Sequence, residues 1–418
     1  MNKNGKELLL LFTRGSAIMP KTYSMTPFLS ILSLSYLSLG ISIPAMSLII
    51  ISKGYPLFYL SLALLCYSVS VITLEVPSGI FCDAKGRKLS YQGGLFFSLV
   101  GVLLLLSSHL LFLCLGFILT GVGRAFTSGS LDALFIESHL KDERKLEDAL
   151  VGMEIVSSLS LALGSFIGGF LLTLAENGPH LTDYVIYVRG VLLVFAFCLT
   201  SIGIKDDTQK KTGPSLRFKG QAKLLKDSVK GNRFLQIYVL FILIQGIQLA
   251  SLESYWQPYL KELLQSDSKL WILGLVGGSV FAFSILGSLL GKFFLGKVRN
   301  GQLFLCCFVC AFVLEGILAL TKKPSPFIVV YCLIYVVLGV VSVVGGYMVN
   351  LSVDSSVRSS VLSLNSFSLQ SGGLLANLLA MLILFFGNIT LFWIVTAGIG
   401  ILAVVILAKP LSKTAPHP

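Results

Sequence analysis

Residues 77–88 read PSGIFCDAKGRK, a charged stretch that separates two long apolar runs. Its last six residues carry four charged side chains, which are Asp83, Lys85, Arg87 and Lys88. A charge at the centre of a membrane helix costs about 2.5–3.5 kcal/mol on the insertion scale, so charges gathered between two apolar runs favour water. The stretch is therefore predicted to be a tight turn at a membrane surface.

The spacing Gly-x-x-x-Asp-x-x-Gly-Arg-Lys has a physical rationale of its own. Gly79 would let two helices approach closely, and Gly86 would permit a turn with positive φ. Asp83 can face a helix N-terminus or an arginine, while Arg87 and Lys88 mark the cytoplasmic side of a membrane. The alternative interpretation is an ordinary basic loop that only fixes topology.

The composition excludes a soluble globular protein. Of the 418 residues, 55% are hydrophobic and 12% are charged, and the mean hydropathy is +0.87. Soluble proteins have about twice this charged fraction. Twelve apolar runs are each long enough to cross about 30 Å of hydrocarbon. They are predicted as all-α spans at residues 27–51, 57–81, 89–107, 110–138, 149–175, 184–204, 234–256, 270–290, 303–320, 327–349, 360–386 and 389–408.

The distribution of Lys and Arg fixes the expected topology. Of 32 such residues, 25 fall in the termini and loops on one side of the membrane and five in the loops on the other side. Because Lys and Arg favour the cytoplasmic side, both termini are expected in the cytoplasm. The net charge of +12 is therefore topological, and no nucleic-acid partner is expected. The predicted regions are a cytoplasmic leader (1–26), an N-terminal six-helix bundle (27–204), a cytoplasmic linker (205–233), a C-terminal six-helix bundle (234–408) and a cytoplasmic tail (409–418). Translation could start at Met1, Met19 or Met25.

Weak internal echoes indicate that the two halves are repeats. The segment from Gly79 to Arg87 has a degenerate partner 212 residues later, from Gly291 to Arg299. A Gly-Gly pair at residues 168–169 recurs 204 residues later, at residues 372–373. Both offsets are close to half of the chain.

The motif at 79–88 resembles the loop between the second and third helices of the major facilitator superfamily of transporters, with Ala84 where that family usually has a basic residue. The resemblance implies two six-helix bundles related by pseudo-two-fold symmetry, with a substrate site between them. It also implies a latch that holds the halves in the outward-open state, in which Arg87 pairs with Glu137 and Asp83 faces the eleventh helix. The latch residues are Gly79, Asp83, Gly86, Arg87, Lys88 and Glu137.

Two further segments resemble motifs of the same superfamily. Arg124 lies in a glycine-rich part of the fourth span that is similar to the family's arginine-bearing helix. Gly164, Gly168 and Gly169 resemble the core of a motif associated with drug–proton antiporters, with Ser165 in place of proline. Small residues at helix contacts also need no transport role, so helix packing is the alternative.

Charges within the spans are candidates for function, because each is costly in hydrocarbon. They are Glu75, Arg124, Asp132, Glu154, Arg189, Glu253 and Glu315. A carboxylate in a low-dielectric pocket can bind a proton on one side of the membrane and release it on the other. The proton-coupling candidates are Glu75, Arg124, Asp132 and Glu154; the alternative for each is a helix-pairing or snorkelling side chain.

The resemblance implies that the first, fourth, seventh and tenth helices line the cavity. Polar or aromatic side chains at helical spacing in these spans are its lining candidates, although interhelical packing would give the same pattern. They are Tyr36, Thr120, Thr127, Phe241, Gln245, Gln248, Tyr255 and Tyr335. Such a lining suits amphiphilic substrates better than sugars.

The leading hypothesis is a monomeric, proton-coupled exporter of drug-like or amphipathic small molecules in the cytoplasmic membrane. The alternatives are an importer or metabolite exporter of a polar or anionic substrate that Arg124 would hold, and a transport-inactive membrane sensor. An enzyme is not expected, because the four histidines lie outside or at the edges of the spans and no nucleotide-binding loop is present. Cys306, Cys307 and Cys310 lack nearby His or carboxylate ligands, so no metal is expected. We also expect no cofactor, with the proton gradient as driving force.

Overall fold

The computed structural model describes residues 25–128, 130–131, 143–175, 180–204, 231–353 and 358–414. Within these ranges the chain forms α-helices and one 3₁₀ turn, and the only extended pairing is an isolated bridge between Leu295 and Val298. The helices of the first half are α2 (Met25–Ser42), α3 (Leu48–Ser52), α4 (Leu57–Lys85), α5 (Arg87–Leu104), α6 (Leu110–Thr127), α8 (Glu143–Leu174) and α9 (Asp183–Gly203). Those of the second half are α11 (Arg233–Leu264), η1 (Asp267–Lys269), α12 (Trp271–Phe294), α13 (Asn300–Leu320), α14 (Pro324–Ser352), α15 (Arg358–Phe386) and α16 (Ile389–Thr414).

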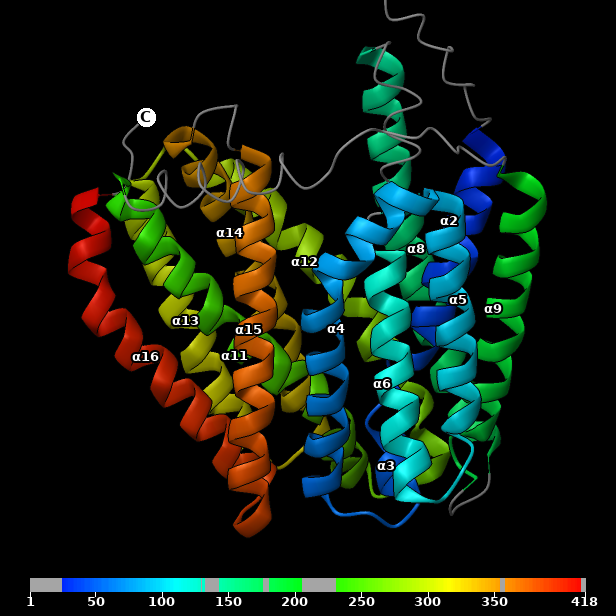
Figure 1. The fold of residues 1–418 in the computed structure, drawn as a ribbon. Coiled ribbons are helices and arrows are strands. Elements are labelled where there is room, and N and C mark those ends of the chain that lie inside the picture. The colour runs from blue at the N-terminus through cyan, green and yellow to red at the C-terminus, as the bar shows by residue number, and fades with distance from the viewer. Residues whose placement is uncertain are drawn as a thin grey trace, which may run out of the picture.

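The long helices run up and down in two groups that stand side by side (Figure 1). In the first group α2 packs against α8 and α9, and in the second α11 packs against α15 and α16. The first helix of each half therefore contacts the fifth and sixth of its own half. This repetition agrees with the expected all-α fold of two related bundles. Most of the predicted linker and most of the leader lie outside the described residues.

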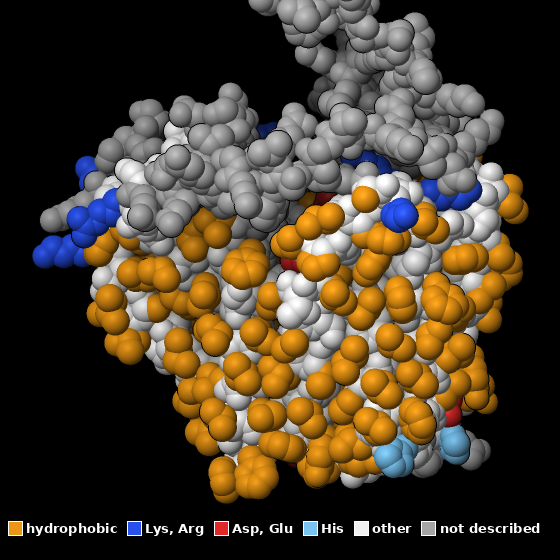
Figure 2. Space-filling model, viewed as in Figure 1, with side chains coloured by type: hydrophobic (Ala, Val, Ile, Leu, Met, Phe, Trp, Pro, Cys, Tyr) orange, Lys and Arg blue, Asp and Glu red, His pale blue; other side chains and the backbone are white. Residues whose placement is uncertain are grey.

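Apolar side chains cover the face of both groups that is turned to the viewer in Figure 2, as a membrane protein requires. Ten helices of the described chain are long and apolar enough to cross a membrane. Helices α2 and α5, at the places of the first and third expected spans, are not among these ten, so ten of the twelve expected spans are supported. Lys and Arg gather at one end of the molecule and His at the other (Figure 2). We call them the Arg87 end and the Asp183 end.

The turn between α4 and α5 is shorter than the sequence indicates. Helix α4 continues through Lys85, α5 begins at Arg87, and Gly86 alone separates them with φ of 102°. The positive φ predicted for Gly86 is thus confirmed, and Gly296 has φ of 75° in the corresponding turn of the second half. The close helix contact predicted at Gly79 is wrong: a Cβ built there meets nothing within 4 Å, because this face of α4 is exposed.

Glycines instead bring the first and fifth helices of each half together. A Cβ on Gly164 of α8 would collide with the backbone of α2 near Gly40, and one on Gly372 of α15 would collide with α11 near Gly246. The structural counterpart of Gly372 is therefore Gly164, not Gly168 as the sequence echo implied. Gly168 also faces the backbone of α2, at Ile41. The predicted packing role of Gly164 and Gly168 is confirmed.

Candidate functional site

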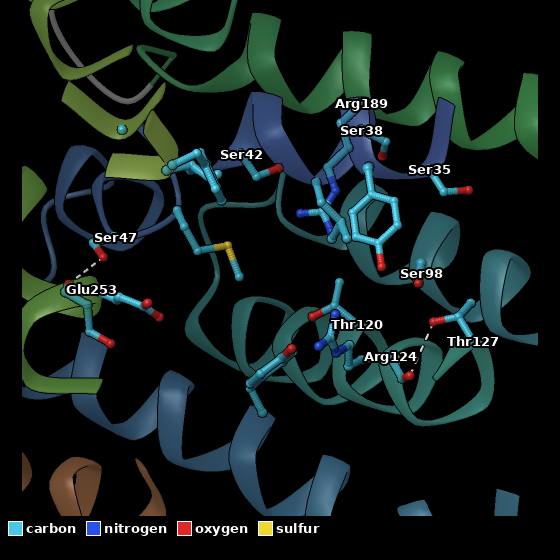
Figure 3. Close-up of a pocket in the computed structure, with 18 of the residues that line it drawn as sticks. Ser35, Ser38, Ser42, Ser47, Ser98, Thr120, Arg124, Thr127, Arg189 and Glu253 are labelled. Carbon is cyan, nitrogen blue, oxygen red and sulfur yellow. Dashed lines mark hydrogen bonds between the residues drawn. The ribbon is translucent and has the colours of Figure 1, made fainter. Parts of the chain in front are cut away.

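A cavity of about 770 Å³ lies between the two halves. Its wall is built from α2, α4, α5, α6 and α9 of the first half and from α11, α12 and α14 of the second. Serine, threonine and tyrosine side chains alternate on this wall with apolar ones, and three charged side chains interrupt them (Figure 3). The cavity lies where two related bundles meet, which is the usual position of a ligand site in a transporter of this architecture.

The two halves are joined by hydrogen bonds on the side of the cavity toward the Asp183 end. Ser61 Oγ and Tyr255 Oη are 2.8 Å apart, and the Gln257 amide donates to the Ile43 carbonyl at 2.9 Å. Ser165 Oγ donates to the Gly274 carbonyl at 3.1 Å. Gly169 of α8 packs so closely on Gly274 of α12 that neither could carry a side chain. The predicted packing role of Gly169 is confirmed, and the partner is the opposite half.

Three charged side chains reach the cavity wall, namely Arg124 from α6, Arg189 from α9 and Glu253 from α11 (Figure 3). Arg124 and Glu253 are exposed to the cavity and interact electrostatically, but they are not within ion-pair distance. Arg189 is only 6% exposed, and its Nε atom has no hydrogen-bond partner. The first half thus supplies two cations and the second half one anion.

Several lining candidates do lie on the wall. They are Tyr36 from α2, Thr120 and Thr127 from α6, and Tyr335 from α14, together with Arg124. The two threonine hydroxyls donate to carbonyls of their own helix, which leaves their oxygen lone pairs for other donors. These side chains give the wall both polar and aromatic character.

The prediction for the seventh span is wrong. Phe241, Gln245, Gln248 and Tyr255 are absent from the wall and are buried within the second half or at its closed interface. The Gln248 amide donates to Glu315 at 3.1 Å, and Glu315 also accepts from Ser251 and Thr396, each at 2.7 Å. A polar stripe that serves a buried network looks the same in sequence as one that faces a lumen. Glu253 is five residues from Gln248, about 140° around the helix, and it faces the cavity instead.

The carboxylates proposed for proton coupling are scattered. Glu75 is on α4 and faces α15, where its Oε2 atom accepts a hydrogen bond from the Gln370 side-chain amide at 3.2 Å. Glu154 is exposed and is absent from the cavity wall. Asp132, and the latch residue Glu137, lie outside the described residues, as does the side chain of Asp83. Glu253 is the described carboxylate on the wall, and its place in the seventh span was the signal that could have found it.

Two helical bundles that enclose a polar cavity at membrane depth define a membrane carrier, in which a solute site lies between two halves that move relative to each other. The comparison with known families makes this specific. A model described as Major Facilitator Superfamily matches residues 28–342, and the chain belongs to that family. The relative that the chain matches in sequence is likewise described as a transporter of this superfamily.

One curated relative, described as an uncharacterized MFS-type transporter, YxaM of Bacillus subtilis (strain 168), is 27% identical over 259 residues. The alignment covers 61% of this chain and 63% of the relative, less than two thirds of its length. The solved structure of the nucleoside transporter NupG has a TM-score of 0.74 at 13% identity and covers 92% of this chain and 98% of its own.

Two other solved structures share the fold. A D-xylose-proton symporter has a TM-score of 0.69 at 14% identity, and the coverage is 93% of this chain and 96% of that one. A bacterial homologue of the human lysosomal transporter Spinster, in an inward-facing and unoccupied conformation, has a TM-score of 0.65 at 12% identity, with 96% of each chain covered. At these identities the likeness shows the fold alone.

Proposed function

We propose that the protein is a proton-coupled secondary active transporter that exports a small amphipathic organic molecule by alternating access. The observation that carries the proposal is the central cavity, which is lined by both halves and closed by hydrogen bonds toward the Asp183 end. Lys and Arg favour the cytoplasmic side of membranes, so the Arg87 end is assigned to the cytoplasm. In this assignment the described state is closed to the outside.

The lining supports an amphipathic solute. Ligand pockets usually have volumes of about 300–1,000 Å³, and this cavity lies in that range. Its wall carries aromatic side chains from both halves, including Tyr36, Trp256 and Tyr335, with hydroxyl groups between them. Export is favoured because the segment 164–169, which resembles an antiporter motif, forms the contacts of α8 with both α2 and α12.

Glu253 is the best-placed proton carrier of the described carboxylates. It is exposed to the cavity, so water could reach it from whichever side is open. Protonation would neutralise its electrostatic interaction with Arg124 across the cavity. The charge balance of the wall would then differ between the loaded and unloaded states, which is the requirement for coupling.

Proteoliposomes with an imposed pH gradient test the proposal. Two amphipathic dyes are supplied separately, the cation rhodamine 6G and the sulfonate sulforhodamine B, with and without a protonophore. We expect gradient-dependent movement of at least one dye, and we expect Glu253→Gln to abolish it. Glu154→Gln is the matched control, because Glu154 is exposed away from the cavity wall. If neither dye moves in either direction under the gradient, the proposal of proton-driven amphipathic transport fails.

A further inference from the structure

Arg189 is a buried cation without a counter-ion among the described residues. It lies six residues into α9, about 9 Å from the start of that helix, and is 94% buried. Its Nε atom makes no hydrogen bond, and it takes part in none of the ion pairs of the described chain. An arginine remains protonated at ordinary pH, so an uncompensated buried guanidinium is strongly destabilising unless an anion joins it.

The acidic groups near Arg189 are engaged or distant. Asp183, on the same helix, is 3.7 Å from Lys53 Nζ and 2.8 Å from His180 Nδ1. It is also six residues from Arg189, which places it about 240° around the helix. Glu253 reaches the cavity from the other half and is not within ion-pair distance of Arg189. The protein therefore does not supply the missing anion from either position.

A second polar group beside Arg189 is also unsatisfied. Ser38 of α2 lines the cavity, is fully buried, and its Oγ atom has no hydrogen-bond partner. Figure 3 shows Ser38 next to Arg189, while Arg124 enters the same space from α6. The Nε of Arg189 and the hydroxyl of Ser38 are thus buried donors without an acceptor, and Arg124, which is exposed to the cavity, adds a second guanidinium beside them. Buried donors usually have partners, so the two unpartnered groups beside Arg124 point to a ligand.

We propose that Arg189, Arg124 and Ser38 form a subsite for the anionic group of an organic substrate, a carboxylate, sulfonate or phosphate. The inference rests on the proposed function, since the ligand is the transported solute. Arginine binds such groups through two parallel hydrogen bonds, which would use the unpartnered Nε of Arg189. The tyrosines of the wall would contact the apolar body of the ligand, and Glu253 would repel a second anionic group at the opposite side.

Direct binding to the purified full-length protein in detergent tests the subsite. The probes share one ring and differ in charge: benzoate, benzenesulfonate and phenyl phosphate are anions, benzamide is neutral and benzylammonium is a cation. Binding is followed at constant ionic strength by tryptophan fluorescence, because Trp256 lies on the wall. The variants are Arg189→Gln, Arg189→Lys, Ser38→Ala and Arg124→Gln. Arg299→Gln is the control, since it makes the same chemical change at an exposed position.

We expect at least one anion to bind, with benzamide and benzylammonium at least about tenfold weaker. Arg189→Gln should weaken anion binding by about ten- to hundredfold, Arg189→Lys by less, and Arg299→Gln not at all. The proposal is overturned if no anion binds, if benzamide binds as tightly, or if Arg189→Gln binds like the wild type. Should Arg189→Gln fail to fold, unchanged binding in both Ser38→Ala and Arg124→Gln overturns it instead.

The binding assay and the transport assay fail independently. Anion binding without gradient-driven movement of either dye contradicts the proposed function and leaves the subsite intact. Gradient-driven movement of rhodamine 6G in a protein that binds none of the anions contradicts the subsite and leaves the transport proposal intact.

Discussion

The contact between Gly169 and Gly274 predicts how the closed side of the cavity can be opened. A Cβ at residue 169 would lie 2.5 Å from the Cα and N atoms of Gly274, and carbon atoms in contact normally stay about 3.5–4.0 Å apart. In Gly169→Ala the helices α8 and α12 must therefore separate by roughly 1 Å at this point. Overpacking of this kind costs about 1–3 kcal/mol.

That cost falls mainly on the state in which the Asp183 end is closed, because α8 and α12 touch there. A free-energy difference of about 1.4 kcal/mol changes an equilibrium constant tenfold. The ratio of molecules open at the Asp183 end to molecules closed there should therefore rise by about 5- to 150-fold. The substitution thus becomes a measurable change in access to the cavity. Gly79→Ala is the matched control, because a Cβ at Gly79 meets nothing within 4 Å.

The assay is thiol labelling in intact cells. A cysteine replaces Ser254, which lines the cavity at the closed side, in a background without the eight native cysteines. A membrane-impermeant maleimide added outside should react faster in Gly169→Ala than in the parent, with Gly79→Ala unchanged. An unchanged rate in Gly169→Ala would refute the reasoning, as would an equal increase in Gly79→Ala.

Three other predictions concern Glu315, Gly86 and Glu253. Glu315→Leu should destabilise the purified protein by about 1–3 kcal/mol, because three buried side chains lose their acceptor; a melting temperature equal to that of the wild type would contradict this network. Gly86→Val should lower the free energy of unfolding by about 1–3 kcal/mol, because valine is strained at the φ of 102° found there, and Gly296→Val at a φ of 75° should lower it by a similar amount. Thermal unfolding tests both variants, and melting temperatures equal to that of the wild type would show that the turns relax without strain. Glu253→Gln should keep dye exchange between equal concentrations while it loses gradient-driven accumulation, and loss of both activities in a folded protein would argue for a binding role instead of coupling.

The fold could be predicted from the sequence because its determinants are local. Apolar runs of membrane length and the charged turn at Gly86 depend on neighbouring residues only, and the bias of Lys and Arg between the two sides needs only the order of those runs along the chain. Glycine packing could also be predicted, although the sequence echo paired Gly372 with Gly168, whereas the close approach to the first helix of the half identifies Gly164. A glycine pattern fixes which residues are small but not which helix they meet.

The site was harder to predict because the face of a membrane helix that meets the lumen depends on its neighbours. Gln245 and Gln248 suggested a lumen, yet the acceptor of Gln248 is Glu315, 67 positions away. Arg189 and Glu253 were recognised as charges within spans, but no local pattern shows that both reach one cavity. Burial and unsatisfied hydrogen-bonding groups, which identify Arg189, exist only once the helices are assembled.

The glycine contact of α2 with α8 has a mechanical consequence for the proposed cycle. At Gly40 and Gly164 the two backbones touch, so α2 cannot stay in place when α8 moves away from α12. Helix α2 also carries Tyr36 and Ser38 on the cavity wall. The movement that opens the cavity at the Asp183 end therefore also displaces the side chains of α2 that would contact the solute. Opening of the outer side and weaker binding of the solute would then occur in the same movement.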